Sequence, residues 1–238
     1  MRHLAAETPV RGVEVLTFDC YGTLIDWETG LWQSLEPLFR RYGVDVASER
    51  ALELYADLES DIERGEYRPY REVLEAVLIG MGDRLRFTPS SSDVERFSRS
   101  VADWPAFSDS AGALEALKTR YKLAVVSNVD DDLFVHAARR LAVPFDWVVT
   151  AQHARAYKPS HSVFRTALAL IGVAPDRILH VAQSLYHDVA PARALGLSTV
   201  WVNRRHGRPG FGATPPSDAR PDFEVPDLWS LARTLGAA

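Results

Sequence analysis

The side chains best suited to chemistry stand directly after four apolar, strand-like segments of the chain. They are Asp19, Tyr21, Thr23, Ser127, Asn128, Lys158, Ser184, His187 and Asp188. In an open parallel sheet, ligands bind beyond the carboxyl ends of the strands. Two carboxylates, an amine, an amide and several hydroxyls are therefore expected to meet at one edge of the sheet.

Asp19 is the candidate nucleophile. A carboxylate is already ionised at neutral pH, so it needs no base before it attacks. It can displace a leaving group from carbon or phosphorus, after which water hydrolyses the ester or acyl phosphate. Lys158 can hold the carboxylate ionised and oriented through charge-assisted hydrogen bonds. Asp188 is expected either to activate the water or to pair with Lys158.

Smaller polar groups complete the predicted catalytic set. Thr23 and Ser127 can donate hydrogen bonds to the nucleophile or to substrate oxygens, although small hydroxyls are also common turn formers. Asn128 can donate to a carboxylate or to a leaving anion. His187 can act as a base for the hydrolytic water, but a histidine at the start of a helix is usually solvated, so Asp188 is favoured for that role.

Strands and helices alternate around these residues. An apolar run at 13–18 predicts a buried strand that ends at Asp19. Beyond residue 105 the pattern predicts strands at 122–127, 145–150, 177–182 and 198–203, helices at 111–120, 131–141, 161–172 and 189–196, and a last helix at 227–235. Residues 204–222 are rich in Gly and Pro and are expected to form a surface loop. The alternation indicates a parallel sheet with crossover helices.

Residues 30–102 have a different pattern. Their apolar residues recur at helical spacing and predict four helices with no strand between them. A helical block is thus inserted after the first strand of a doubly wound sheet. The expected fold class is α/β, with a core formed by residues 1–28 and 105–238 and a helical cap formed by residues 29–104.

Two further groups of residues have structural interpretations. Asp130, Asp131 and Asp132 are expected to cap the helix that follows them and to complement its dipole. Three tryptophans are candidates for an apolar cleft between cap and core, although ordinary core burial explains each of them equally well. They are Trp27, Trp32 and Trp104.

Composition excludes several classes of function. The chain of 238 residues has a formal net charge of -5, whereas nucleic-acid binding would need a basic surface. Its apolar runs are much shorter than the ~20 residues of a membrane span, and its first residues lack the apolar stretch of a signal peptide. The single cysteine, Cys20, allows no internal disulfide. A cytoplasmic protein without nucleic-acid or membrane partners is expected.

Four short motifs resemble those of the haloacid dehalogenase superfamily, in order and in approximate spacing. They are F-D-C-Y-G-T-L at 18–24, V-S-N at 126–128, Y-K-P at 157–159 and the segment that ends at Asp188. The resemblance covers nearly the whole chain. It implies a Rossmann-like core, a cap that closes over the site, and attack on substrate by the aspartate of the first motif, Asp19.

Two positions favour the 2-haloacid dehalogenase branch (type II) over the phosphatases of this superfamily. Phosphatases usually carry a second aspartate as general acid where this chain has Tyr21. They also carry an acidic pair that holds Mg²⁺, and here Gln183 leaves only Asp188 of that pair. Mg²⁺ prefers anionic oxygen ligands, so no metal and no other cofactor is expected. The resembled branch is metal-independent, and a halide leaves without a proton.

Other positions depart from that branch. Gln183 and Leu185 replace its serine and asparagine, and Phe164 replaces its tyrosine. The cap arginine that accepts the halide has no clear counterpart, and the candidates are Arg64, Arg68 and Arg71, of which Arg68 is nominated as a substrate-binding residue. The segments S-L-Y-H-D and D-C-Y-G-T-L-I-D-W-E-T-G are similar to a subgroup related to azetidine-2-carboxylate hydrolase, which opens a strained ring by the same attack at carbon.

The predicted function is hydrolysis at C2 of a small 2-substituted carboxylic acid through an aspartyl ester, with 2-haloacid dehalogenation as the leading reaction. Ring opening of azetidine-2-carboxylate, Mg²⁺-dependent phosphatase activity and a non-catalytic binding role are the alternatives. The partner is a small carboxylic acid, and a homodimer is one expectation for the assembly. The residues expected to bind substrate are Tyr21, Trp27, Arg68, Asn128 and Ser184.

Overall fold

Six parallel strands form a single sheet in the computed structural model, which describes residues 12–208 and 210–238. The sheet order is β3-β2-β1-β4-β5-β6, as expected for a doubly wound α/β fold. The strands are β1 (Val15–Phe18), β2 (Lys122–Ser127), β3 (Trp147–Thr150), β4 (Ile178–Ala182), β5 (Ser198–Val202) and β6 (Phe223–Val225). The parallel, Rossmann-like sheet predicted from the sequence is therefore confirmed.

The central strands are apolar along their whole length because both faces of the sheet are covered. Successive side chains point to opposite faces. Leu123 and Val125 of β2 belong to the larger of two hydrophobic clusters, while Ala124 and Val126 of the same strand belong to the smaller one. A strand with a period-two polar pattern would have left one of these faces open to water.

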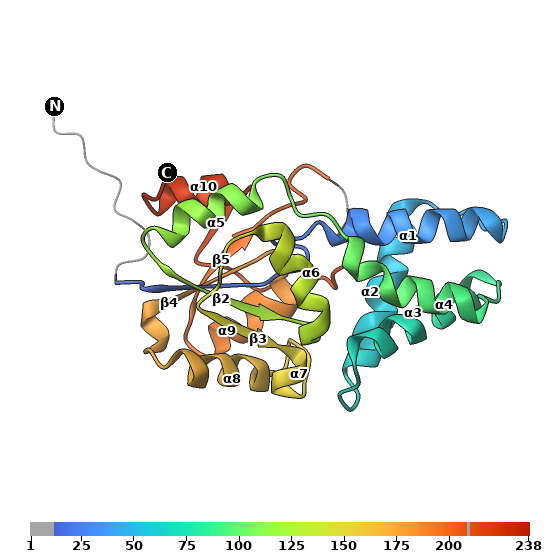
Figure 1. The fold of residues 1–238 in the computed structure, drawn as a ribbon, viewed down its shortest axis with the longest axis horizontal. Helices are drawn as coiled ribbons and strands as arrows, with labels where there is room; N and C mark the ends of the chain where they lie inside the picture. Colours follow the sequence, from blue (N-terminus) through green and yellow to red (C-terminus); the bar gives the residue numbers. More distant parts are fainter. Residues whose placement is uncertain (1–11, 209) are drawn as a thin grey trace.

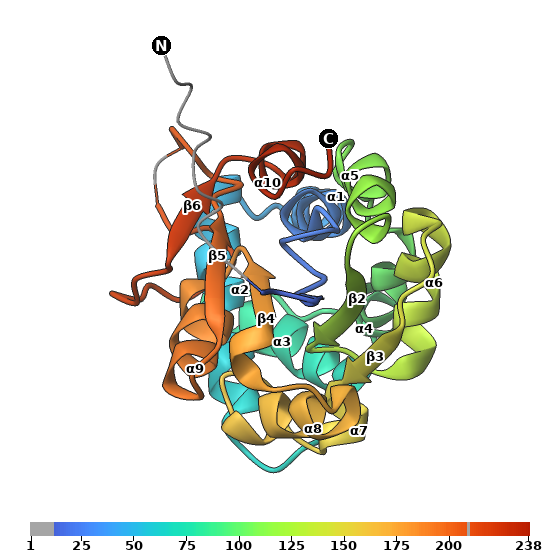
Figure 2. The ribbon, with the colours of Figure 1, turned by 90° about the vertical axis from the view of Figure 1, so that its left-hand side faces the viewer.

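Helices cover both faces of the sheet, as Figure 2 shows. The larger cluster receives side chains from α5 (Ser110–Lys118), α6 (Asp131–Leu141) and α10 (Leu228–Thr234). The smaller cluster receives them from α8 (His161–Ile171) and α9 (Ala190–Ala194). A four-residue helix, α7 (Ala151–Ala154), follows β3, and one π-helical turn (Leu185–Val189) precedes α9.

Four helices between β1 and β2 form a helical insert at the end of the sheet where β1 finishes (Figure 1). They are α1 (Trp27–Arg41), α2 (Ser48–Glu63), α3 (Tyr70–Leu85) and α4 (Ser91–Arg99), and a short 3-10 turn follows at Ser100–Asp103. The predicted number and order of helices are correct. The domain boundaries 28/29 and 104/105 stay predictions.

Asp130 corrects one expectation about helix capping. It stands at the N-terminus of α6, but its side chain makes no capping hydrogen bond. Its carboxylate instead accepts from the Tyr67 hydroxyl at 2.5 Å and from the Tyr70 amide at 2.7 Å. Both partners belong to the insert, so this aspartate joins the insert to the end of β2. The preference of Asp for helix starts gave no sign of this long-range role.

Other differences from the sequence expectations are small and local. Strand β6 was not predicted, since it has only three residues and follows a loop rich in Gly and Pro. Helix α7 was also missed. Residues 1–11, on which the expected absence of a signal peptide depends, lie outside the described residues. In the part of the chain that is described, no helix is long and apolar enough to cross a membrane.

Close packing of the insert against the turn after α4 generates the first prediction. A Cβ added at Gly30 would lie 2.3 Å from the ring of buried Trp104. Gly30→Ala is therefore expected to lower the free energy of unfolding by about 1–3 kcal/mol through overpacking, as measured by urea denaturation.

Gly80→Ala is the matched control. Its Cβ would meet only the flexible end of Leu58 at 3.0 Å, and alanine improves a helix interior by about 0.5–1 kcal/mol. Equal stability of the two variants would contradict the tight contact at Trp104.

Candidate active site

Asp19 lies at the mouth of the sheet, directly after β1. Its amide donates to the Val181 carbonyl of β4 at 3.0 Å, which fixes the backbone at the end of the strand. Strand β1 pairs with β2 on one side and β4 on the other, so Asp19 stands at the switch point of the doubly wound sheet, where such folds bind ligands. The residue is only 6% exposed.

Lys158 joins the two predicted carboxylates. Its Nζ donates to Asp19 Oδ1 at 2.8 Å, to Asp188 Oδ1 at 2.7 Å and to the Val126 carbonyl at 3.0 Å. All three ammonium protons are therefore used inside the protein. Asn128 fixes the lysine backbone, because its Oδ1 accepts from the Lys158 amide at 2.7 Å and its Nδ2 donates to the Lys158 carbonyl at 3.2 Å.

Thr23 holds the other oxygen of the nucleophile candidate. Its hydroxyl donates to Asp19 Oδ2 at 2.6 Å and accepts from the Gln183 amide at 2.8 Å. The turn between them needs Gly22, whose φ of +97° is rarely adopted by other residues. Both oxygens of Asp19 are thus held by donors, and the neighbouring Cys20 is buried.

His180 supports Asp188 from inside β4, and sequence reasoning missed it. Its Nε2 lies 2.9 Å from Asp188 Oδ1, and its Nδ1 lies 2.9 Å from the Thr17 hydroxyl. The neutral tautomer with the proton on Nε2 satisfies both contacts, since the Thr17 hydroxyl can then donate to Nδ1. A histidine inside an otherwise apolar strand was the available signal.

Burial and the shared lysine set the charge of this triad. Burial raises the pKa of Asp19 above its ordinary value, although Lys158 opposes the change. Burial acts in the same direction on Asp188, but Lys158 and His180 outweigh it and lower the pKa of that carboxyl. Burial would lower the pKa of Lys158, yet Asp188 and Asp19 raise it. The ammonium is therefore permanently charged, and Asp19 is the more basic carboxylate.

A small cavity of about 30 Å³ lies over Asp19. It is lined by Asp19, Tyr21, Trp27, Glu59, Tyr70, Asn128, Val129, Lys158, Gln183, Ser184, His187, Asp188 and Thr214. This volume equals roughly one water molecule. A substrate with several heavy atoms therefore needs more room than this cavity alone provides. The predicted binding residues Tyr21, Trp27, Asn128 and Ser184 all line this cavity.

Arg68 and Ser127 do not line that cavity. Arg68 is exposed, and its backbone carbonyl accepts from the Tyr157 hydroxyl at 2.8 Å. The other nominated arginines bind surface aspartates, Arg64 with Asp61 and Arg71 with Asp132. Ser127 is fully buried, and its hydroxyl has no hydrogen-bond partner among the described residues.

The remaining tryptophans are placed elsewhere. Trp104 packs edge-on against Tyr21, with ring centroids 5.7 Å apart, and Trp32 packs against Phe39. Only Trp27 of the three reaches the wall of the catalytic cavity.

His187 is buried, contrary to the expectation of a solvated residue. It lines the cavity, and its amide donates to the Ser184 hydroxyl at 2.8 Å. Burial lowers the pKa of His187 to about 4, so the ring is neutral at pH 7. A neutral imidazole at this place is able to accept a proton from water.

Glu59 and Tyr70 of the insert complete the cavity wall and were not predicted. Glu59 Oε1 accepts from the Tyr55 hydroxyl at 2.7 Å and from the Tyr70 hydroxyl at 2.6 Å. Burial raises the pKa of Glu59 to about 7, although both tyrosines oppose the change. The signal in the sequence was the spacing of Tyr55, Glu59 and Glu63, which places all three on one face of α2.

The side chains at this edge do not fit magnesium. The carboxylates of Asp19 and Asp188 both accept from Lys158. Gln183 carries no charge, and its Oε1 accepts from the Thr214 hydroxyl at 3.3 Å. Among the residues that the structure describes, no group of three or more His, Cys, Asp or Glu side chains is placed to hold a metal. Mg²⁺ prefers anionic oxygen ligands, so this donor set disfavours it.

The fold is a doubly wound sheet, and a lysine holds a buried carboxylate at its switch point. This combination is typical of α/β enzymes whose active site contains a carboxylate. A family model for haloacid dehalogenase-like hydrolases matches residues 16–202. The chain therefore belongs to the haloacid dehalogenase-like hydrolase family, as the motifs indicated. The proteins that it resembles include (S)-2-haloacid dehalogenases.

Two curated proteins and one solved structure illustrate the similarity. A haloacetate dehalogenase H-2 from Moraxella sp. (strain B) is 27% identical over 232 residues, which cover 95% of this chain and 99% of that protein. An (S)-2-haloacid dehalogenase from Pseudomonas sp. (strain YL) is 29% identical over 242 residues, covering 95% and 96%. A crystal structure of L-2-haloacid dehalogenase from Xanthobacter autotrophicus with chloropropionic acid covalently bound has a TM-score of 0.77 at 22% identity, covering 94% and 98%.

The pKa of Glu59 generates a prediction about stability. Its pKa is about 7 in the folded protein and about 4.3 in an unfolded chain. Folding therefore takes up a proton between these two values, and this group lowers the free energy of unfolding as the pH rises through that window. Glu59→Gln keeps an oxygen that accepts from both tyrosines and removes the effect.

Between pH 5 and pH 8 the difference between the two pKa values corresponds to about 2.5 kcal/mol. Since 1 kcal/mol shifts the melting temperature of a chain of this size by about 2–4 °C, we expect the melting temperature of Glu59→Gln to rise relative to that of the wild type by about 5–10 °C over this range. Thermal melts monitored by circular dichroism measure this difference. Glu66→Gln, at an exposed glutamate of the insert, should run parallel to the wild type. A Glu59→Gln variant that loses stability relative to the wild type as the pH rises would show that the carboxyl is ionised throughout.

Proposed function

We propose that this chain hydrolyses the bond between C2 and the leaving group of a small 2-substituted carboxylic acid, through an ester formed on Asp19, and that 2-haloacids are substrates. The observation that carries the proposal is the contact of Lys158 with both Asp19 and Asp188 inside a cavity at the sheet edge. The relatives named as a haloacetate dehalogenase and a 2-haloacid dehalogenase support the choice of substrate.

Attack by Asp19 is favoured by its surroundings. The carboxylate is almost free of water, and burial raises its pKa, both of which make an oxygen more nucleophilic. Lys158 and Thr23 fix its two oxygens and leave the side chain little freedom to rotate. One carboxylate oxygen bonds to C2 while the halide leaves with the electron pair of the broken bond. No proton has to be supplied at this step.

Hydrolysis of the ester then needs a base close to Asp19. After attack the ester carries no charge, so Lys158 remains paired with Asp188. Asp188 and the neutral His187 both line the cavity. Either side chain is therefore placed to activate a water molecule that enters it. Water attacks the carbonyl carbon of the ester, the 2-hydroxy acid leaves, and the carboxylate of Asp19 is restored. We favour Asp188 for water activation, as in the sequence-based prediction.

Several parts of this proposal concern the protein beyond the reacting atoms. The insert acts as a cap that opens to admit substrate and closes to exclude bulk water. The enzyme is proposed to need no cofactor, to be cytoplasmic, and to form a homodimer.

Single-turnover labelling tests the ester directly. Excess enzyme is mixed with 2-chloropropionate in ¹⁸O water, and the tryptic peptide that contains Asp19 is weighed by mass spectrometry. One labelled oxygen should appear in Asp19 and none in the first lactate released, because water attacks the ester and not C2. Label in the first product and none in the peptide would refute covalent catalysis.

Release of inorganic phosphate from phosphate esters, abolished by EDTA, would instead favour a phosphatase.

Lys158→Met tests the role of the ammonium. Without it Asp19 and Asp188 face each other unneutralised, so one carboxyl keeps a proton at neutral pH. We expect kcat for 2-chloropropionate to fall by about 10²–10³-fold, the usual effect of removing one charged or hydrogen-bonding group from a reacting centre, with partial recovery at higher pH. Lys118→Met, which removes a surface ion pair with Asp146, should leave kcat unchanged. Full activity of Lys158→Met at pH 7 would exclude the proposed role.

A further inference from the structure

A second cavity adjoins the catalytic one at the turn that contains Lys158. Its volume is about 300 Å³, compared with about 30 Å³ for the catalytic cavity. Lys158 and His187 line both cavities, so the two spaces share a wall. The proposed attack keeps C2 and its carboxylate close to Asp19, and the second cavity offers room for a chain attached to C2.

Arg155 gives this second cavity a positive charge that no acidic side chain balances among the described residues. Of the other cations in its lining, Lys158 is held by two carboxylates and Arg64 binds Asp61. The Arg155 guanidinium instead lies over the ring of Tyr67, 4.4 Å from its centroid. Stacking on a ring occupies the face of a guanidinium and leaves the N–H groups in its plane able to donate.

Tyr67 holds this guanidinium at the junction of insert and core. Tyr67 belongs to the insert, between α2 and α3, whereas Arg155 follows α7 in the core. The Tyr67 hydroxyl donates to Asp130 Oδ1 at 2.5 Å, and its ring lies 5.5 Å from the ring of Tyr157, centroid to centroid. The aromatic support of Arg155 is thus fixed by two contacts with the core.

Glu63 places a carboxyl group in the wall of the same second cavity. Its Oε2 accepts from Asn128 Nδ2 at 3.1 Å, whereas its Oε1 is buried and has no hydrogen-bond partner in the part of the chain that is described. Burial raises the pKa of Glu63 well above its ordinary value, and Glu59 adds to the effect. The neutral acid is therefore favoured, and its O–H, on the oxygen that does not accept from Asn128, is able to donate.

A carboxylate is the group that matches these two donors. A guanidinium binds a carboxylate through two parallel hydrogen bonds, and a neutral carboxyl donates its single proton to an anionic oxygen. An alkyl chain in the second cavity would leave the buried oxygen of Glu63 without a partner, and an unpaired buried polar group costs free energy. The wall formed by Arg155 and Glu63 therefore favours an acidic group over an apolar one.

We propose that Arg155, with Glu63 as a second donor, binds a carboxylate at the far end of the substrate, so that 2-halogenated dicarboxylic acids are a substrate class of this enzyme. This inference rests on the proposed attack of Asp19 at C2. The reaction at C2 is unchanged, since an oxygen of Asp19 bonds to C2 while chloride leaves with the electron pair of the broken bond. Water then hydrolyses the ester, and the products are a 2-hydroxy dicarboxylic acid, one chloride and one proton.

Arg155→Met tests the proposal with two matched pairs of substrates. Chloride release is measured from 2-chlorosuccinate and 2-chloroglutarate, and from 2-chlorobutyrate and 2-chlorovalerate, in which a methyl group replaces the far carboxylate. KM for the two diacids should rise by about tenfold or more, because a charge-assisted contact is lost. Their kcat should stay within about twofold of the wild type, since the contact is equally strong in the ground state and the transition state. Both monoacids should be unaffected.

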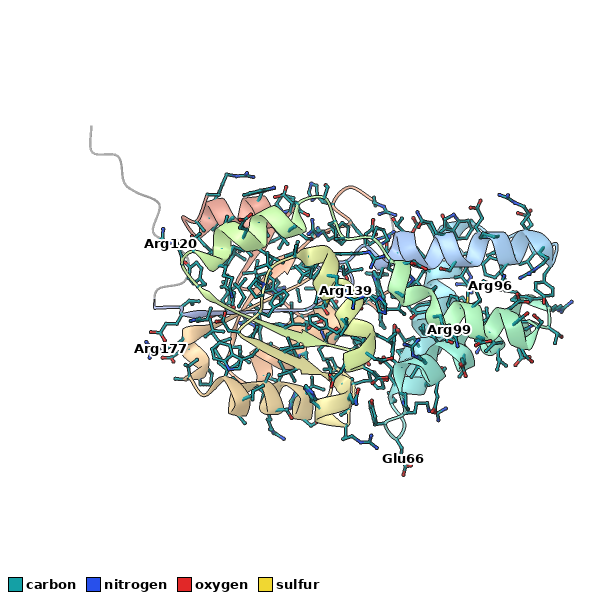
Figure 3. All side chains as sticks on the ribbon, in the orientation of Figure 1. Glu66, Arg96, Arg99, Arg120, Arg139 and Arg177 are labelled. Atoms are coloured by element: carbon teal, nitrogen blue, oxygen red, sulfur yellow. The ribbon has the colours of Figure 1, made fainter. Side chains whose placement is uncertain are left out.

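Two further variants separate recognition of the far carboxylate from damage to the fold. Arg155→Lys keeps the charge but loses the planar fork, so its KM for the diacids should lie between those of the wild type and Arg155→Met. Arg139→Met is the matched control, because Arg139 is an exposed arginine of α6 that lines neither cavity (Figure 3). It should leave all four substrates unchanged.

The outcomes distinguish this inference from the proposed function on which it rests. Label in Asp19 after turnover of 2-chloropropionate in ¹⁸O water, without chloride release from either diacid, would overturn the inference alone. Equal losses on diacids and monoacids in Arg155→Met would also overturn it, because the arginine would then support the fold near Tyr67 and not bind a carboxylate. Absence of label in Asp19 with every substrate would overturn both proposals.

Discussion

The contact of one buried ammonium with two buried carboxylates governs the structure of the site. Lys158 is 1% exposed and has no water to replace a lost partner, so Asp19, Asp188 and the Val126 carbonyl must all meet its three protons. That requirement ties the ends of β1, β2 and β4 to the turn after α7. Breaking such a pair leaves an uncompensated buried charge, so the fold must keep these groups together.

Residues that follow strands could be predicted because their place depends only on local pattern. Asp19, Thr23, Asn128, Lys158 and Asp188 each lie within a few residues of an apolar run, and a parallel sheet gathers such positions at one edge. The predictions that failed concerned residues whose positions depend on contacts between distant segments of the chain. Glu59 and Tyr70 reach the site only because the insert packs over the strand ends, and Arg68 turns outward although its spacing allowed the opposite. The role of His180 could not be predicted, because a position inside a strand predicts a residue of the hydrophobic core.

The insert contributes to the electrostatics of the site. Its contribution to the cavity wall includes an acid held by two tyrosines, where the resembled dehalogenases are expected to present a halide-accepting arginine. The same insert is joined to the core through Asp130, which accepts from Tyr67 and from the Tyr70 amide. Tyr70 thus fixes the position of the insert with its backbone and the orientation of Glu59 with its hydroxyl.

The closed insert also affects which leaving group the site can accommodate, because the charge of that group must be compatible with the charges of the cavity wall. With room for roughly one water, the cavity has no solvent to screen its carboxyls, so every group that enters changes their protonation. A departing halide adds negative charge and is compatible only with a protonated Glu59 and Glu63. Burial places the pKa of Glu59 near neutrality, where its proton costs little to gain or lose.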